Sequence, residues 1–478
     1  MMIRPNFAAQ TSAPVARPAA APAAAPTSEP APSAPSESGS FGAIPQRIAS
    51  VSASAVAAVQ ADIGQGEYVE GEVIVKLKSG QVGLFNDFAA QYGGEVVETF
   101  DVPQSIYKSF DGDLIRMKLP AGITTAEAIA AMGSDERVAY AESNDVLHFL
   151  ETEPAQVPND LDPKLWGFKN EGQTGGKVGA DSNVVGAWKT TIGNGSDQGP
   201  LIAIIDSGAD LDHPDLVGNL WVNPGEIPGN GIDDDGNGVI DDVHGYDAGD
   251  DDGSPDDGVG HGTHVAGTIG AVGNNGIGVT GVMQKARLMP IKIDSGGRIT
   301  TDGAIRAALY ATKMGADITN NSWGGSRLNQ ATEDAYRASP ALHIAAAGNN
   351  GVDTDRSPFY PMGFDIPNMI AVGATDHNDA KAGFSNYGAT SVDVTAPGKD
   401  ILSTKNGGGY HVLSGTSMAS PFVTGVAGLI MSAYPDASHD EIKSRLIDGS
   451  DKVAGLEGKS VSNGRVNAEK AVAPRNEE

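Results

Sequence analysis

The sequence predicts an α/β protein: a large, doubly wound and mostly parallel sheet, preceded by a small ferredoxin-like α+β domain and a disordered leader. The C-terminal part of the chain alternates apolar, strand-like runs with helical patterns, as in a parallel sheet covered by helices on both faces. Ahead of it, a shorter stretch follows the order β-α-β-β-α-β. The 478 residues therefore divide into a leader (1–66), a small domain (67–150), a linker (151–158) and a large domain (159–478).

The leader is rich in Ala, Pro and Ser, as in residues 17–22 (RPAAAP). Such a segment buries too little apolar surface to offset the entropy that is lost when a chain becomes ordered. Within it, only residues 50–63 are expected to be transiently helical. A targeting or wall-spanning spacer is the functional alternative to plain disorder.

The spacing of apolar residues predicts the helices and strands of the small domain. The run at 72–77 (EVIVKL) alternates and is β-branched, which predicts a strand. A short helix begins at Thr124 or Thr125, with Glu127 placed as the acid of a capping box. The other expected elements are a helix at 82–92 and strands at 95–100, 114–119 and 137–142.

The large domain follows a polar, proline-containing linker that offers little to pack and is expected to be exposed. Residues 201–205 (LIAII) form a continuous apolar run, as expected of a central parallel strand that is buried on both faces. Comparable runs predict further strands at 288–293, 318–322, 342–346 and 369–372.

The composition excludes several classes of partner. The formal net charge is -29, so we expect no nucleic acid and no anionic membrane among the partners. No apolar stretch is expected to span a bilayer, and no secretory signal is evident at the N-terminus. The chain has no cysteine, so stability must come from packing, bound metal or both. The many carboxylates suit a calcium-binding protein.

Three short segments carry residues suited to nucleophilic catalysis. Asp206 follows the strand at 201–205, at the edge where doubly wound sheets build their sites, and its carboxylate can orient an imidazole. His261 stands between two glycines at a helix start and can take a proton from a hydroxyl. Ser417, in the segment GTSMASP, opens a long apolar helix whose first N–H groups point toward developing negative charge. Each residue alone is more often structural, and only the combination points to catalysis.

A fourth segment supplies a hydrogen-bond donor. Residues 345–350 (AAAGNN) follow an apolar strand, and their small side chains, Gly348 included, let a substrate backbone approach. The side-chain amide of Asn349 can then donate to an oxyanion together with the backbone N–H of Ser417.

Together and in this order, the segments resemble those of the subtilisin family of serine proteases, over about residues 159–478. The resemblance implies a subtilisin-like fold in which Asp206 orients His261, the general base and then acid. It makes Ser417 the nucleophile of an endopeptidase that works through an acyl-enzyme, and Asn349 the oxyanion donor. The alternatives are an inactive family member that binds peptides with calcium, and a lipase or esterase. The last is disfavoured because the serine lacks the motif Gly-x-Ser-x-Gly.

The resemblance also implies where the substrate lies. The segment Ser322-Trp323-Gly324 follows a buried strand, and the matching segment of the family pairs its backbone with an extended substrate. With Gly348, these residues form the expected substrate groove. Trp323 is large enough to enclose an apolar side chain, which predicts a preference for apolar or aromatic residues before the cut. The alternative is a tryptophan of the core.

An acidic loop predicts a first calcium site. Residues 233–242 (DDDGNGVIDD) resemble an EF-hand-type loop, with oxygen ligands at alternate positions. His244 stands where such a loop has its closing glutamate, so a later aspartate is expected to complete the shell. The candidate ligands are Asp233, Asp235, Asn237, Asp241 and Asp242. The alternative is an acidic, solvated insertion.

A second calcium site is implied by the resemblance alone. The segments 211–216 (LDHPDL) and 273–279 (GNNGIGV) match those that hold calcium in subtilisin-like proteins. The corresponding side-chain ligands are Asp215 and Asn275, with Asp160 as a further ligand near the expected mature N-terminus. Calcium that binds only the folded state would stabilise the protein by mass action.

The small domain resembles the propeptides of subtilisin-like zymogens. This implies that it assists folding, packs on the catalytic domain and inhibits it until self-cleavage between residues 148 and 159 removes it. The expected protein is a secreted, monomeric, calcium-stabilised zymogen, although no signal peptide is evident. Its expected partners are protein or peptide substrates and its own propeptide as an intramolecular inhibitor.

Overall fold

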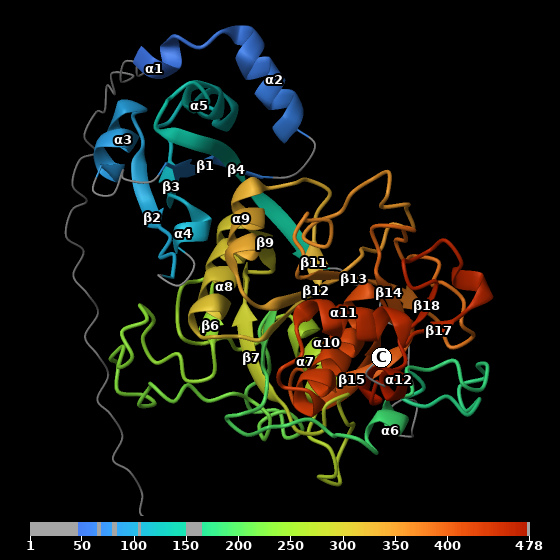
Figure 1. Ribbon diagram of the computed structural model, residues 1–478. Helices are drawn as coiled ribbons and strands as arrows, with labels where there is room; N and C mark the ends of the chain where they lie inside the picture. Colours follow the sequence, from blue (N-terminus) through green and yellow to red (C-terminus); the bar gives the residue numbers. More distant parts are fainter. Residues whose placement is uncertain (1–45, 65–67, 79–83, 104–106, 150–164, 476–478) are drawn as a thin grey trace, which may run out of the picture. The chain divides into compact units, whose positions relative to one another are not determined.

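The computed structural model describes residues 46–64, 68–78, 84–103, 107–149 and 165–475 (Figure 1). Most of the expected leader, the whole expected linker and the predicted ligand Asp160 lie outside these residues. The described chain has the predicted fold class, with a small α+β domain followed by a large α/β domain.

The small domain is an antiparallel sheet of four strands in the order β2-β3-β1-β4. Alternate residues of β1 face two different layers: Val73 and Val75 pack against the helices of the small domain, whereas Ile74 packs into the large domain. The predicted capping box is present on α5, where Thr124 and Glu127 satisfy each other's backbone N–H groups. The elements are β1 Tyr68–Leu77, α3 Phe85–Gln91, β2 Glu95–Thr99, α4 Tyr107–Phe110, β3 Asp113–Lys118, α5 Thr125–Met132 and β4 Val138–Phe149.

Two helices precede this sheet, so the folded chain begins earlier than the predicted residue 67. Helix α1 is Gln46–Ala49 and helix α2 is Ala53–Ile63. Ile48 is buried in the core of the small domain, and Arg47 forms an ion pair with the buried carboxylate of Asp135 at 3.0 Å. The prediction of a disordered leader is wrong here because a few apolar side chains anchor an otherwise alanine-rich segment.

Strand β4 is longer than the predicted strand at 137–142. Its 12 residues first pair with β1 and then continue between two short strands of the large domain, β9 (Arg298–Thr300) and β11 (Trp323–Gly324). One sheet therefore runs from the small domain into the large one.

The large domain is built on a sheet of nine strands, in the order β17-β18-β14-β13-β12-β10-β5-β7-β6. Neighbouring central strands pair in parallel, as predicted. The strands are β5 Leu201–Asp206, β6 Tyr246–Asp247, β7 Arg287–Lys292, β10 Ile318–Asn321, β12 Leu342–Ala346, β13 Met369–Thr375, β14 Val394–Pro397, β17 Asp451–Lys452 and β18 Gly464–Arg465. The hairpin of β15 (Ile401–Lys405) and β16 (Gly409–Leu413) lies outside this sheet.

Helices cover both faces of this sheet (Figure 1). Ile202 and Ile204 of β5 pack with α7 and α10 in one core, whereas Leu201, Ala203 and Ile205 pack with α8 and α9 in the other. This alternation confirms the doubly wound arrangement. The helices are α6 Val184–Ala187, α7 His261–Gly270, α8 Thr301–Lys313, α9 Gln330–Ala338, α10 Thr416–Ala433, α11 His439–Asp448 and α12 Ala468–Val472.

Helix α10 is the central helix of the large domain. By length and composition it could cross a membrane, the only described helix of which this is true, yet 83% of its apolar window is buried inside the protein. Its apolar side chains are therefore accounted for by the core.

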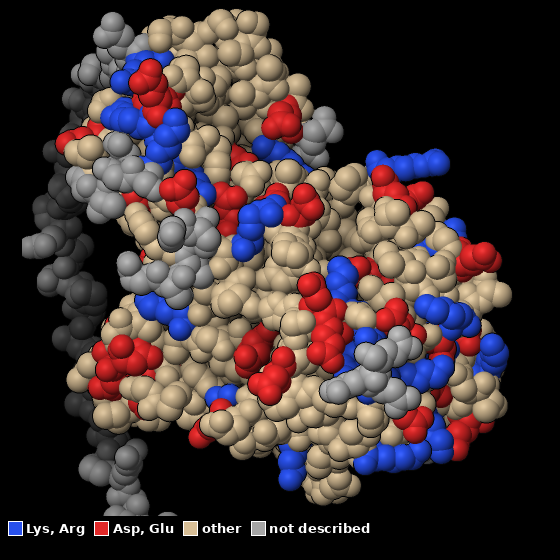
Figure 2. Space-filling view, viewed as in Figure 1, with Lys and Arg blue, Asp and Glu red and all other residues tan. Residues whose placement is uncertain are grey.

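The loops between β5 and α7 are rich in Asp and contain no Lys or Arg. Figure 2 shows acidic side chains in several groups on this face, one of them at the lower left. These loops form the green segments at the lower left of Figure 1 and include the predicted calcium loop at 233–242. On this face, Lys and Arg lie outside these loops. The negative charge of the protein is therefore unevenly distributed over its surface.

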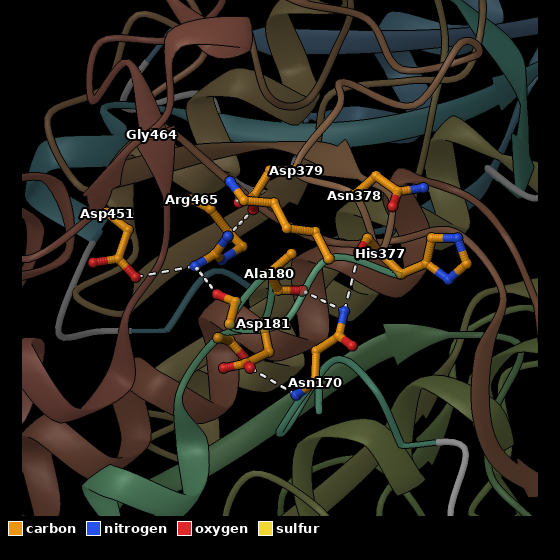
Figure 3. Close-up of polar contacts among 12 residues, drawn as sticks. Asn170, Ala180, Asp181, His377, Asn378, Asp379, Asp451, Gly464 and Arg465 are labelled. Carbon is orange, nitrogen blue, oxygen red and sulfur yellow. Dashed lines mark hydrogen bonds and ion pairs between the residues drawn. The ribbon is translucent and has the colours of Figure 1, made fainter. Parts of the chain in front are cut away.

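A buried arginine joins the start of the described large domain to its end (Figure 3). The side chain of Arg465 is 2% exposed and forms ion pairs with Asp379 and Asp451, the latter at 3.0 Å. It also donates to the carbonyl oxygen of Gly179 at 3.0 Å. Nearby, Asn170 donates to the carbonyl oxygen of His377 at 3.0 Å. Three segments far apart in the sequence thus meet around one guanidinium.

We expect an Arg465→Met substitution to lower the free energy of unfolding by about 3 to 5 kcal/mol, because it removes the buried cation of Asp379 and leaves that buried carboxylate with only the exposed Lys177. Urea unfolding of the full chain, followed by tryptophan fluorescence, measures this. Arg475→Met is the control: that arginine is 42% exposed and pairs with the exposed Asp448, so its loss should cost less than about 1 kcal/mol. Equal stabilities of the two variants would contradict the role of Arg465.

Candidate active site

Asp206 and His261 are in direct contact at the carboxyl edge of the central sheet. Asp206 ends β5 and His261 begins α7, and the imidazole Nδ1 lies 2.6 Å from the Asp206 Oδ1 atom. Both side chains are fully buried, at 0% exposure. Burial raises the pKa of the Asp206 carboxyl, while the neighbouring imidazole and the Ser207 N–H act against this rise. Because the carboxylate holds Nδ1, it sets the orientation and the tautomer of the ring.

Two hydrogen bonds through the Ser207 hydroxyl hold the start of α7 against the end of β5. The Gly262 N–H donates to the Ser207 hydroxyl at 2.8 Å, and that hydroxyl donates to Asp257 at 2.9 Å. A Cβ atom on Gly262 would lie 2.1 Å from the carbonyl oxygen of Gly208, so no other residue fits there. This close approach is what brings the imidazole to the carboxylate.

Ser417 lies at the start of α10, next to the expected substrate strand. Its hydroxyl donates to the carbonyl oxygen of Ser322 at 3.1 Å, and the Ser322 hydroxyl donates back to the Ser417 carbonyl oxygen at 3.1 Å. Ser322 follows β10, which is the neighbour of β5, and α10 packs against α7. The carboxylate, the imidazole and the hydroxyl therefore come from adjacent elements at one edge of the sheet.

Asn349 is oriented by Thr416, a residue that the sequence analysis did not single out. The Asn349 Oδ1 atom accepts from the Thr416 N–H at 2.9 Å and from its hydroxyl at 3.0 Å. The Nδ2 atom is buried and has no hydrogen-bond partner among the described residues. A side-chain amide held by its oxygen, with its nitrogen unused beside Ser417, is suited to donate to an oxyanion. The sequence signal that could have identified Thr416 is its position directly before Ser417 in the segment GTS.

The expected substrate strand is occupied by the small domain. Residues Trp323 and Gly324 form β11 and pair antiparallel with Phe149 and His148 of β4. The indole of Trp323 is 1% exposed and lies in the core with α8 and α9, as a core tryptophan would. The backbone of this segment, rather than its large side chain, faces the neighbouring strand.

Phe359, which sequence reasoning missed, lies between the two glycine segments of the groove. A Cβ atom on Gly324 would be 2.7 Å from its ring, and one on Gly348 would be 3.1 Å from it. Gly348 has a φ of 98°, a conformation that glycine adopts without strain. The ring of Phe359 therefore fills the space between Gly324 and Gly348.

The predicted calcium loop brings two of its acids together with a third from outside the motif. Carboxylate oxygens of Glu226, Asp235 and Asp242 lie within 4.8 Å of one another. Asp242 is fully buried, and burial raises the pKa of its carboxyl. The Oε2 atom of Glu226 is buried without a hydrogen-bond partner among the described residues. Three clustered carboxylates, one of them unsatisfied, fit a hard cation such as calcium.

The other predicted ligands of this loop have different contacts. Asp233 accepts the backbone N–H groups of Asn237 and Gly238, and Asp241 accepts three backbone N–H groups from residues 229–231. Asn237 itself lies at the cluster, donating to Asp242 at 2.7 Å and to Asp235 at 3.1 Å. Glu226 was missed because it precedes the acidic run by several residues and carries no motif of its own.

The second predicted calcium site brings Asp215 and Asn275 into contact. The Asn275 amide donates to one Asp215 oxygen at 2.5 Å, and the Val279 N–H donates to the other at 2.9 Å. Asp215 is fully buried. The ring of Tyr410 lies against this group, and burial, with Asp215 adding to it, raises the pKa of Tyr410 to about 12.

Comparisons with known proteins agree with this arrangement. The profile of the subtilase family matches residues 197–466, and that of the fervidolysin N-terminal prodomain matches residues 54–144. The thermophilic serine proteinase of Bacillus sp. (strain AK1) is 35% identical over 415 residues, 85% of this chain and 88% of that protein. Thermitase of Thermoactinomyces vulgaris is 39% identical over 291 residues, 60% of this chain and 91% of that protein.

The solved structure of fervidolysin from Fervidobacterium pennivorans has the same fold, with a TM-score of 0.63 at 24% identity, over 86% of this chain and 62% of that one. Fold, site and relatives together define a serine protease. The chain belongs to the subtilase family, and its small domain, residues 46–149, is called the prodomain from here on.

Proposed function

We propose that the chain is the zymogen of a calcium-stabilised serine endopeptidase, with Asp206, His261 and Ser417 as its catalytic residues. The observation that carries this proposal is the buried contact between Asp206 and His261 at the edge of the sheet where α10 presents Ser417. The unused amide of Asn349 supports it, since this donor is already aimed by Thr416.

In the proposed mechanism, His261 takes the proton of Ser417 as the serine oxygen attacks a peptide carbonyl. The negative charge that develops on the carbonyl oxygen is stabilised by the Asn349 amide and the Ser417 N–H. His261 then gives its proton to the leaving amine, and an acyl-enzyme remains. Water, activated by the same imidazole, releases the acid product. Asp206 keeps the ring oriented and stabilises its charged form.

The substrate is proposed to bind as an added strand, in the way that β4 lies against β11 and β9. Backbone hydrogen bonds of this kind give affinity for many sequences, which suits an enzyme that cuts unfolded protein or peptide segments. Ser322, Gly324 and Gly348 would line the position next to Ser417. The partners are therefore protein or peptide substrates and the prodomain.

Phe359 is expected to limit the side chain accepted just before the cut to small and medium apolar groups. A Phe359→Ala enzyme should prefer phenylalanine over alanine at this position about tenfold more strongly than wild type does, because the vacated space admits a ring. A set of fluorogenic peptides that differ only at this residue measures the ratio of kcat/KM values. A ratio that does not change would show that Phe359 lies outside the pocket.

Calcium is proposed to bind at two places. Glu226, Asp235 and Asp242 would hold one ion, and Asp215 with Asn275 would contribute to the other. An ion at either place would neutralise buried carboxylates and cross-link a loop to the domain. No catalytic step depends on it.

We further propose that the enzyme acts outside the cell as a monomer. Its groove is covered by β4 of the prodomain, which suits a broad protease that must travel in an inactive form. Because β4 covers the groove, we also propose that the prodomain is an intramolecular inhibitor, which the enzyme itself cuts away.

An irreversible serine-directed phosphonate tests the proposed function directly. The matured enzyme is expected to gain one phosphonyl group on Ser417, as found by peptide mass mapping, and to lose all peptidase activity. A His261→Ala chain should not react, because its serine is not activated. Peptide binding without labelling would instead favour the noncatalytic peptide-binding protein that the sequence left open.

A further inference from the structure

We propose that Arg327 forms a distal subsite that binds an acidic side chain of the substrate, three residues before the substrate residue that pairs with Gly324. This proposal rests on the proposed endopeptidase function and adds a substrate class to it: segments with Asp or Glu well upstream of the cut. The prodomain residue at this position is Asp145.

The contact between Arg327 and Asp145 is close and largely dry. The Arg327 Nη1 atom lies 2.8 Å from the Asp145 carboxylate and donates to the Ser143 hydroxyl at 2.6 Å. The Ser143 hydroxyl in turn donates to Asp145 at 2.5 Å. The two charged side chains are 14% and 7% exposed. An ion pair with additional hydrogen bonds and little solvent is stronger than an exposed one.

The backbone of Asp145 is fixed by the catalytic domain, which aims its side chain at the arginine. The Asp145 N–H donates to the Thr301 hydroxyl at 2.7 Å, and that hydroxyl donates to the Asp145 carbonyl oxygen at 3.1 Å. The next residue of β4, Val146, pairs with Thr300 of β9. The strand pairing with β9 ends at Val146, and the Thr301 hydroxyl continues the hydrogen bonds of the catalytic domain to the backbone of Asp145, so a substrate residue at position 145 would lie at the end of the groove.

Removal of the prodomain would leave the cation without its partners. Among the described residues, the ion pairs and hydrogen bonds of the Arg327 guanidinium all go to the prodomain: Asp145, Ser143 and, at 3.7 Å, Asp62. Glu142 of the prodomain also acts on it through charge. After maturation, Arg327 would lie at the end of the groove as an unpaired positive charge beside Thr301.

Such a cation favours a peptide that brings a carboxylate to the same position. A charge-assisted hydrogen bond in a partly buried place is expected to favour Asp over Asn by about tenfold in kcat/KM. A lysine there should be disfavoured, because like charges would meet. Salt should reduce both effects, since the emptied site is open to solvent.

The test uses enzyme matured from the full chain and three internally quenched peptides with the sequence of residues 141–156. One peptide keeps Asp at the position of Asp145, the second has Asn and the third has Lys. Wild type is expected to cut them in the order Asp, Asn, Lys. Arg327→Gln should bring the three rates within about twofold, and Arg327→Glu should invert the order. A purely structural arginine would not produce this inversion.

Arg337→Gln is the matched control, because this arginine lies on α9, is 45% exposed and pairs with Glu333. It should keep the wild-type order. Phosphonate labelling confirms that each variant has an intact nucleophile. Equal cutting of the three peptides by wild type would overturn the distal subsite and leave the endopeptidase proposal standing. Absence of both cutting and labelling would overturn the endopeptidase proposal itself.

Discussion

A Ser417→Ala chain is expected to keep all 478 residues and to lose peptidase activity by about a million-fold, whereas wild type shortens itself. The reason is that the prodomain strand already lies on β11, the strand next to the proposed nucleophile. Mass spectrometry of the purified full chain, together with a fluorogenic peptide assay, measures both effects. Full-length wild type with full activity would contradict the zymogen proposal.

The register of β4 also predicts where the first cut falls. Phe149 pairs with Trp323, and His148 pairs with Gly324. In an antiparallel pairing, the substrate residue after the one opposite Trp323 would lie opposite Ser322, whose carbonyl oxygen accepts from Ser417. We therefore expect cleavage after Leu150, so that N-terminal sequencing of the first product begins at Glu151.

Ser432→Ala is the control for the loss of the serine. Its hydroxyl donates to the Gly428 carbonyl oxygen within the same helix, α10, away from the proposed site. This variant should shorten and cut peptides as wild type does. If it too stayed full length, the effect of Ser417→Ala would reflect the helix and not the nucleophile. A first product that began elsewhere would contradict only the register argument.

Removal of calcium is expected to lower the melting temperature by many degrees. An ion that binds only the folded chain, at a thousand times its Kd, contributes about 4 kcal/mol, and the chain has no disulfide to compensate. Calorimetry of the inactive Ser417→Ala chain with calcium or with a chelator measures the change without self-digestion. The same melting temperature in both conditions would refute both calcium sites.

Single substitutions separate the two sites. Asp242→Asn should abolish the part of the calcium effect that comes from the acidic loop, and Asp215→Asn the other part. Asp234→Asn is the matched control, because this loop acid accepts from Ile227 and Asn230 and lies outside the carboxylate cluster. It should retain the full calcium effect. A control variant that lost as much as Asp242→Asn would point to general charge in the loop.

The sequence predicted the central sheet well because strands buried on both faces consist of uninterrupted apolar residues, as in β5. The edge of the sheet indicated Asp206 as a site residue, and the resemblance to the subtilisin family implied that it would contact His261, as it does. Thr416 and Phe359 were missed for a different reason. Their roles arise from contacts with Asn349 and with two distant glycines, and periodicity carries no information on such contacts.

The second half of β4 was missed because the polar residues 142–145 interrupt its apolar pattern before Val146. Glu142 accepts the first N–H groups of α9, and the Asn144 side chain accepts the N–H of Asp302 at the start of α8. In the sequence, a polar stretch of this kind is typical of the solvated end of a strand. In the structure their polar groups satisfy helix ends of another domain, an environment that the local pattern does not reveal.

Because β4 serves the sheets of two domains at once, cutting the chain at its end would not by itself open the groove. The severed strand would stay hydrogen-bonded along both edges, and the groove would open only when it peels away. The stability of the folded prodomain would set the lifetime of that nicked complex. This lifetime would determine the delay between the first cut and the appearance of activity. Activity after the first cut should rise with a lag, and destabilising the prodomain core should shorten this lag.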